Sequence, residues 1–427
     1  MLAENRTEVT YRYERWRALS AGVIETAGTT FLMLIAVRWF QAGSLAKGLV
    51  AGGGSLGLIC APWVVSRVEA ARWPVARAAS RLAATSAVSF ALMALIPLLP
   101  VFVVGAVFSM ACFASAIPLM TQIYQENYPE TERGVRFSRT VMIRIATAAA
   151  FGQCAGLALS DRTHFEFLGW GFTGRIEYFR GLLLVFAGAF AFASFCLARL
   201  PSRPLVASGS THPFRALKYA RDDRVFRQTL IAWMFLGFAN LMMVPLRVEY
   251  LANPRYGVTL RGAALTAGTI ALLTGVLPNL ARLLLNPLWG WLFDRMNFFL
   301  LRITLNIGFV LGILSFFVSG SMAGLIAGAI FFGVSMAGGD VAWSLWVTKF
   351  APPDRVADYM SVHTFFTGVR GVIAPLVAFH LVGGLSLPVM GWISAGLIVV
   401  GSLFLVPEIR SGRAARPAAA LVEEVSE

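Results

Sequence analysis

Long apolar stretches without a single formal charge dominate the pattern of this 427-residue chain. Residues 82–125 form a charge-free run of 44, and residues 303–339 and 371–407 form runs of 37 each. A bilayer span needs about 20 apolar residues, so each run predicts two spans joined by a short turn. Turn-forming residues lie inside all three runs, at Pro97–Pro100, Ser319–Gly324 and Gly383–Pro388. The pattern therefore predicts helical hairpins that lie in lipid.

The same pattern over the whole chain predicts an all-α polytopic membrane protein with twelve transmembrane helices. We expect the helices at about residues 19–41, 47–66, 79–98, 101–124, 139–160, 180–199, 228–250, 264–290, 302–319, 323–348, 359–382 and 387–407. The predicted organisation is a cytoplasmic arm (1–18), a six-helix bundle (19–200), a cytoplasmic linker (201–223), a second six-helix bundle (224–410) and a cytoplasmic tail (411–427).

Composition agrees with a membrane protein. The mean hydropathy is +0.70, 57% of residues are hydrophobic and only 14% are charged, which is outside the range of soluble globular proteins. The four cysteines, Cys60, Cys112, Cys154 and Cys196, fall within apolar runs and lack the spacing of metal ligands. We therefore expect no disulfide, no metal site and no cofactor.

The basic residues indicate the topology. The loops between spans 1 and 2, 3 and 4, 5 and 6, and so on lie on one side of the membrane. Of 36 lysines and arginines, only six lie in these loops: Lys47, Arg162, Arg175, Arg180, Arg255 and Arg261. By the positive-inside rule both termini are cytoplasmic, in a plasma membrane of the bacterial inner-membrane type. The first residues carry basic groups without a cleavage pattern, which favours an arm over a signal peptide. The net charge of +14 is then a topology signal, and no basic soluble module predicts nucleic-acid binding.

The two halves of the chain resemble each other. Pro129-x8-Ser138 recurs as Pro352-x8-Ser361 at an offset of 223, and Pro62-x6-Glu69 recurs as Pro287-x6-Asp294 at an offset of 225. Arg38 and Arg247 pair at an offset of 209, and the longer loop at 251–263 accounts for the difference. The three matches fit a single alignment of the two halves, which indicates a tandem duplication into two pseudo-symmetric bundles. This architecture is typical of transporters.

The loop after the eighth span carries a family motif. Its sequence, Gly290-Trp-Leu-Phe-Asp294-Arg295-x6-Arg302, resembles the Gly-x-x-x-Asp-Arg signature of the major facilitator superfamily, which is followed by basic residues. The resemblance implies that Asp294 and Arg295 stabilise one access state from the cytoplasmic side. The first-half copy lacks the glycine and the Asp-Arg pair, and Glu69 is the candidate substitute for the missing acid. The Arg-x-x-Gln-Gly and Gly-Pro patterns of the drug/proton antiporter branch are absent from the fourth and fifth spans.

Five charges lie in the middle of predicted spans: Glu25, Arg144, Arg282, Asp340 and Arg370. A charge at the bilayer centre costs about 2.5–3.5 kcal/mol on insertion scales, so it persists only beside a partner or water. In the superfamily, helices 3, 6, 9 and 12 lie outside the central cavity, and these predicted spans carry none of the five. The charges therefore predict a substrate or ion pathway.

Helical periodicity extends this pathway. His363, Thr367 and Arg370 share one face of the eleventh span, and Asp340 shares a face with Trp343 and Ser344 on the tenth. Each candidate keeps a structural alternative. The arginines either pair with acids to fix the packing of the helices or line the substrate pathway. For Arg282, which lies nearest the cytoplasmic end, the structural role is favoured. Glu25, Asp340 and His363 are candidate proton carriers, while Asp340 is also a candidate helix cap. Trp343 either stacks on substrate or packs between helices.

The sequence thus predicts a secondary active transporter in which residues 1–200 rock against 224–410. Three core arginines against two core acids favour a small anionic or zwitterionic solute, with protons as the coupling ion. We expect a monomer with a small-molecule substrate in a lipid bilayer. A uniporter and a non-transporting receptor of the same fold remain alternatives. Four scattered histidines without a His-x-x-x-His arrangement argue against an enzyme, and the absence of a phosphate-binding loop favours protons as the source of energy.

Overall fold

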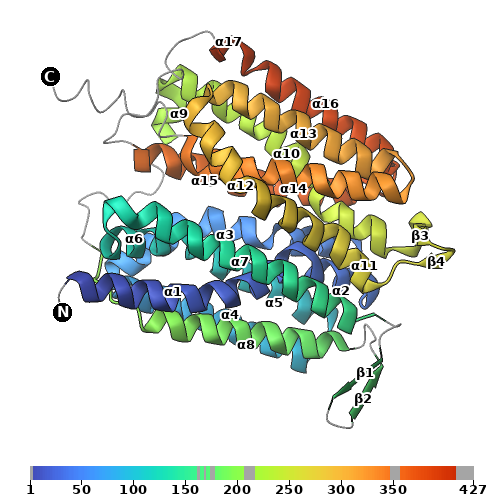
Figure 1. The fold of residues 1–427 in the computed structure, drawn as a ribbon, viewed down its shortest axis with the longest axis horizontal. Coiled ribbons are helices and arrows are strands. Elements are labelled where there is room, and N and C mark those ends of the chain that lie inside the picture. Colours follow the sequence, from blue (N-terminus) through green and yellow to red (C-terminus); the bar gives the residue numbers. More distant parts are fainter. Residues whose placement is uncertain are drawn as a thin grey trace. The chain divides into compact units, whose positions relative to one another are not determined.

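A computed structural model describes residues 3–160, 164–167, 170–173, 178–205, 217–346 and 356–409, and nearly all of that part is helical (Figure 1). Within it, twelve helical segments are long and apolar enough to cross a membrane. They are Arg6–Arg38, Ser44–Ala70, Val75–Leu95, Leu99–Tyr124, Arg139–Ala158, Phe179–Ala198, Arg224–Ala252, Ala267–Phe293, Phe298–Val318, Met322–Trp343, Val362–Leu381 and Leu387–Ile409. The predicted all-α polytopic fold with twelve spans is confirmed.

The elements of the first half are α1 (Ala3–Thr26), η1 (Ala27–Phe31), α2 (Leu32–Arg38), α3 (Ser44–Ala70), α4 (Val75–Leu95), α5 (Leu99–Ser115), α6 (Ile117–Asn127), α7 (Glu130–Ala158), β1 (His164–Phe167), β2 (Trp170–Thr173) and α8 (Phe179–Ala198). A proline lies in the first turn of α5 and of α6, where its missing N–H removes no intrahelical hydrogen bond. These prolines mark where helices begin after a break.

The elements of the second half are α9 (Lys218–Asp222), α10 (Arg224–Ala252), η4 (Pro254–Tyr256), β3 (Thr259–Leu260), β4 (Ala263–Ala264), α11 (Ala267–Ala271), η5 (Leu272–Val276), α12 (Leu277–Arg295), α13 (Phe298–Val318), α14 (Met322–Leu345), α15 (Val356–Leu381), α16 (Leu387–Leu403) and α17 (Val406–Ile409). Asp223 caps α10, because its Oδ1 accepts from the backbone N–H of Phe226 at 3.0 Å. Its Oδ2 accepts from the Tyr359 hydroxyl at 3.0 Å. Burial, together with this bond, raises the pKa of Tyr359 to about 12.

Equivalent helix pairs recur in the two halves. In the first, α3 packs along α5 and α4 along α8, and in the second, α12 packs along α14 and α13 along α16. Small residues permit these approaches: a Cβ at Gly57 would lie 2.2 Å from the Ala111 carbonyl oxygen, and one at Gly333 would lie 2.4 Å from that of Pro278. The recurrence fits two halves of six spans each.

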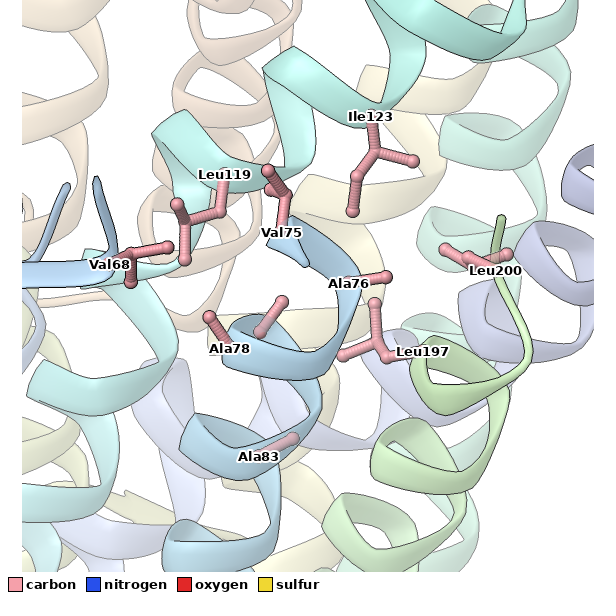
Figure 2. Packing of buried hydrophobic residues seen from close by; sticks show 10 residues of the cluster. Val68, Val75, Ala76, Ala78, Ala83, Leu119, Ile123, Leu197 and Leu200 are labelled. Atoms are coloured by element: carbon pink, nitrogen blue, oxygen red, sulfur yellow. The ribbon is translucent and has the colours of Figure 1, made fainter. Parts of the chain in front are cut away.

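An apolar cluster packs around the first turns of α4 in the first half (Figure 2). It joins α4 to the ends of its neighbours through Val68, Val75, Ala76, Ala78, Ala79, Ala83, Leu119, Ile123, Leu197 and Leu200. The alanines of α4 have small side chains, which lets α8 lie close along it.

By its contacts the chain divides into two compact units. The first unit comprises residues 1–213 and 248–276, and the second comprises 214–247 and 277–427. The last residues of α10, the β3–β4 hairpin, α11 and η5 thus belong to the first unit, although they follow the linker in sequence. The hairpin turn uses Arg261 and Gly262 at positive φ, which explains why a glycine stands there.

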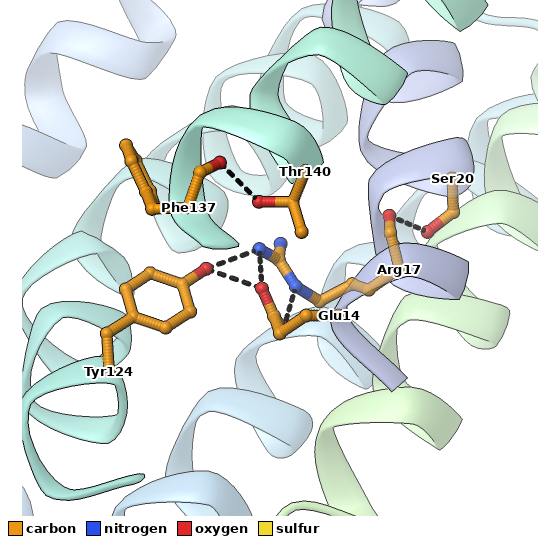
Figure 3. A network of polar contacts seen from close by, with 6 residues as sticks. All are labelled: Glu14, Arg17, Ser20, Tyr124, Phe137 and Thr140. Carbon is orange, nitrogen blue, oxygen red and sulfur yellow. Dashed lines mark hydrogen bonds and ion pairs between the residues drawn. The ribbon is translucent and has the colours of Figure 1, made fainter. Parts of the chain in front are cut away.

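The first helix is longer than predicted. We placed its start at residue 19, but α1 begins at Ala3, and Glu14 is fully buried. Its polar residues satisfy one another: Arg17 donates to both carboxylate oxygens of Glu14, at 2.6 and 2.8 Å, and Tyr124 donates to Glu14 at 2.5 Å (Figure 3). Hydrogen-bonded in this way, charged residues are stable inside a helical bundle. Hydropathy alone predicts that these residues lie in a solvated arm outside the first span.

Candidate functional site

An ion pair in the first unit joins two predicted pathway residues. Glu25 on α1 lies 3.0 Å from Arg144 on α7, measured from Oε2 to Nε. The two helices are close because Gly22 faces the Arg144 backbone, where a Cβ would lie 2.5 Å from the carbonyl oxygen. The side chains keep 18% and 35% exposure, so the pair is partly open. An open carboxylate paired with a guanidinium is able to exchange its partner for another anion.

A second ion pair, in the second unit, joins Arg282 on α12 to Asp340 on α14. The Nε–Oδ2 distance is 2.5 Å, and Arg282 also donates to Asn279 at 3.4 Å. Here the arginine is the buried partner, with 8% side-chain exposure against 37% for the aspartate. α14 runs without a break through Gly338 and Gly339, so Asp340 does not cap an unwound turn.

His363 lies in an aromatic box in the second unit. Its ring is completely buried and lies 5.1 Å from Trp233, 5.6 Å from Trp343 and 5.0 Å from Trp346. Arg370, two turns further along α15, donates to the Trp233 carbonyl and to Thr367. The predicted stripe of α15 therefore faces the interior of the second unit.

The predicted gating residues lie at helix ends. Gly290, Asp294 and Arg295 occupy the last turns of α12, and Glu69 is the penultimate residue of α3. The side chain of Asp294 lies outside the described part of the structure. Arg295 is exposed and covers the ring of Trp291 at 4.5 Å. Arg302 differs from the rest of this set, because it lies inside α13 with only 2% exposure.

A buried ion pair that the sequence did not predict joins α3 to α10 within the first unit. The Lys47 ammonium donates to Glu249 Oε1 at 2.8 Å, with 9% and 0% side-chain exposure. Arg38 extends this contact by donating to the carbonyls of Ala252 and Leu265 at 2.6 and 2.9 Å. Ala252 ends α10, and a cation there satisfies its terminal carbonyls. The only sequence signal was that Lys47 stood among few basic residues on its predicted side.

Two π-helical segments meet in the first unit. η1 interrupts the first span and η5 interrupts the eighth, and the hydroxyls of Thr30 and Thr274 are 3.2 Å apart. Next to them, a Cβ at Gly156 on α7 would lie 2.6 Å from Cβ of Ala271. Single turns of π-helix occur often at functional sites, because they redirect the backbone within a continuous helix. Glu25 lies two residues before η1.

Solved structures resemble the whole chain in fold. The nucleoside transporter NupG matches with a TM-score of 0.70 at 12% identity, over 94% of this chain and 99% of that one. A POT family transporter in complex with a thioalcohol-conjugated peptide matches with a TM-score of 0.67 at 13% identity, over 95% and 96%. The inward-open xylose transporter XylE from E. coli matches with a TM-score of 0.65 at 16% identity, over 98% and 99%.

No protein-family profile and no curated protein sequence matches the chain. The likeness is thus one of three-dimensional structure, and the structures named above are all transporters. Together with twelve apolar spans and the Gly290–Arg295 motif, it shows that the chain has the major facilitator superfamily fold.

Proposed function

We propose that this protein is a proton-coupled secondary transporter of a small anionic or zwitterionic solute. The observation that carries the proposal is that an acid–arginine pair with at least one partly exposed partner lies within the apolar spans of each unit, Glu25–Arg144 in the first and Asp340–Arg282 in the second. All four residues lie in apolar spans, where an unpaired charge is unfavourable. Each guanidinium is thus positioned to bind the carboxylate or phosphate of a solute when its own acid is neutralised.

The coupling follows from competition for the arginine. A proton that binds Glu25 or Asp340 neutralises the carboxylate and weakens its hold on the guanidinium. The anionic group of the solute then takes the vacated place, because arginine binds carboxylate and phosphate in a bidentate manner. When the proton leaves, the internal pair re-forms and displaces the solute. Proton and solute therefore cross together.

Two structural neighbours support this choice of chemistry. A D-xylose–proton symporter has a TM-score of 0.62 at 16% identity, and a POT family transporter in complex with 5-aminolevulinic acid has one of 0.66 at 14% identity. The first is coupled to protons and the second holds a zwitterion, and both share the fold of this chain.

The topology belongs to the same proposal. We place both termini in the cytoplasm of a plasma membrane and expect a functional monomer. Asp294 and Arg295, with Glu69 as their first-half counterpart, then stabilise the state closed to the cytoplasm. Labelling of single cysteines at the tips of loops with an impermeant reagent tests this placement.

Uptake by proteoliposomes tests the function. A thermal-shift screen of carboxylates, amino acids, peptides, phosphates and nucleosides first finds a ligand, which stabilises the fold by about 2.7 kcal/mol at a hundredfold excess over Kd. The labelled ligand should accumulate when the external pH is lower than the internal pH. Glu25→Gln and Asp340→Asn should abolish accumulation.

Glu8→Gln is the matched control. Glu8 and Arg136 form an ion pair at 2.8 Å between the same two helices as Glu25 and Arg144, but Glu8 is 65% exposed. Its loss should leave uptake unchanged. Uptake that ignores the pH gradient would identify a facilitator, and binding without uptake would identify a receptor. Either result would contradict the proposal.

A further inference from the structure

The interior of the second unit holds a group of hydrogen-bond donors that the transport mechanism does not use. Arg302 from α13, with Arg370 and His363 from α15, are 2%, 4% and 0% exposed. The indole of Trp233 from α10 lies among them: the guanidinium carbons of Arg302 and Arg370 are 4.0 and 5.7 Å from its centroid. We call Arg302, Arg370, His363 and Trp233 the cationic cluster.

Several buried nitrogens of the cationic cluster have no hydrogen-bond partner among the residues that the structure describes. They are Nε of Arg302, Nε of Arg370, Nε1 of Trp233, and both ring nitrogens of His363. Arg370 uses its terminal nitrogens on the Trp233 carbonyl and on Thr367 Oγ1, and its Nε remains without an acceptor among the described residues. Buried donors in native proteins nearly always have a partner, so a group of them that is unsatisfied points to a missing acceptor.

Charge leads to the same conclusion. Within the described part of the second unit, no acidic side chain forms an ion pair with Arg302 or Arg370. A guanidinium stays charged in proteins, and two such charges without a counterion are strongly disfavoured in a buried site. Cation–π contact with Trp233 offsets part of the free-energy cost of burying these charges, although both arginines share the same indole ring.

The backbone makes room for this arrangement. Gly237 on α10 faces Arg370, and a Cβ there would lie 2.5 Å from both Cζ and Nε. The guanidinium therefore lies directly against the helix at a position that only glycine permits. Its position is thereby fixed close to α10, which also carries Trp233.

We propose that the cationic cluster is a binding site for a compact anion that only accepts hydrogen bonds. The donors match such a ligand, because arginine and tryptophan side chains have no acceptor atom and His363 can turn its one N–H toward the anion. Two sources share this chemistry: a free inorganic anion, such as chloride or phosphate, and the carboxylate of an organic solute. The site is separate from Arg282, which already has Asp340 as its counterion.

Anion-dependent thermal stability of the purified full-length protein tests this site. The protein is exchanged into a buffer whose only anion is a bulky sulfonate, and chloride, phosphate or acetate is added at constant ionic strength. The melting temperature should rise with saturation for at least one of the three. Arg302→Gln and Arg370→Gln should each raise the half-saturating concentration at least tenfold.

The sign of the variants' own stability is a second readout. Without a small anion, Arg302→Gln should melt above the wild type, because it removes an uncompensated buried charge. With saturating anion the order should reverse. An arginine that only serves packing would instead lower the melting temperature in every buffer when replaced. That result, or no saturable anion effect on the wild type, would overturn the proposal.

Two further variants guard against unfolding and non-specific effects. Gly237→Ala keeps every charge but displaces Arg370, and it should weaken the anion effect at least tenfold. Arg81→Gln removes an exposed arginine that also covers a tryptophan ring, that of Trp73 at 4.0 Å, and it should leave the anion effect unchanged. An effect of chloride or phosphate assigns the site to a free ion, and an effect of acetate alone assigns it to a carboxylate solute. Because no flux is measured, failure here leaves the transport proposal standing.

Discussion

Two ion pairs in the first unit have similar chemistry and different surroundings. Lys47–Glu249 is enclosed, with 9% and 0% side-chain exposure, whereas Arg144–Glu25 keeps 35% and 18%. The enclosed pair is reinforced by Asn253, which donates to the same Glu249 oxygen at 2.9 Å. The open pair has an ion-pair distance of 3.0 Å, and its two helices approach closely at Gly22.

The difference separates two roles. A buried pair contributes little net stability compared with apolar residues, but removal of one partner is strongly destabilising. It therefore acts as a fixed connection between α3 and the end of α10. A partly exposed pair holds its partners weakly, because water and solutes compete for them. It is therefore suited to exchange. The predictions that follow test this division, and the effect on stability falls from one to the next.

The largest effect is expected at the enclosed pair. Glu249→Gln and Lys47→Met should each lower the free energy of unfolding by about 3–5 kcal/mol, because each leaves a buried charge without its partner. The double variant Lys47→Met with Glu249→Leu should recover most of the loss. Chemical denaturation in detergent measures all three. Additive losses in the double variant would show that the pair is not a unit.

A smaller effect is expected for Asp340→Asn, which leaves Arg282 paired only to neutral groups. Since Arg282 has 8% side-chain exposure, we expect a loss of about 2 kcal/mol, between the enclosed and the open cases. The same denaturation experiment gives the value. A loss below that of Glu25→Gln would contradict the order set by burial.

The open pair should contribute less still. Glu25→Gln should change the free energy of unfolding by about 1 kcal/mol or less, because both partners are less buried than those of the enclosed pair. Its transport phenotype should nevertheless be complete. A variant that folds like the wild type and fails to accumulate solute would separate function from stability. A loss as large as that of Glu249→Gln would place Glu25 among the structural residues.

The smallest effect is expected where the two π-helical segments meet. Thr30→Val removes the hydroxyl bond to Thr274 but keeps the shape of the side chain, so we expect a loss of about 0.5 kcal/mol. Thr274 still donates to the Ile270 carbonyl at 2.8 Å, which limits the cost. Melting curves of this variant and of Thr304→Val, an exposed threonine on α13, measure the difference.

The sequence predicted the twelve spans because uninterrupted apolar runs are nearly specific to membrane helices. It also predicted that Arg144, Arg282 and Asp340 face polar surroundings, since a charge in an apolar helix needs a partner. It did not predict which partner, because pairing depends on how helices pack side by side. The two π-helical segments gave no signal at all, as a one-residue insertion in a helix leaves the composition unchanged.

The residues that were misjudged share one feature, a place near the end of a span. Glu14 lies in the predicted cytoplasmic arm, yet it is completely buried. Arg302 was grouped with Asp294 and Arg295 because it follows them in the motif, and its burial in α13 became visible only in three dimensions. Hydropathy locates helices along the membrane normal, but it does not reveal which side of a terminal turn faces the bundle.

Proton movement driven by solute is the most direct test of coupling through the open pairs. Proteoliposomes with an internal pH dye, and no initial gradient, receive the ligand identified by thermal shift. The wild type should acidify the lumen, Glu8→Gln should behave identically, and Glu25→Gln and Asp340→Asn should give no acidification while still binding the ligand. Acidification that persists in both acid variants would contradict the account.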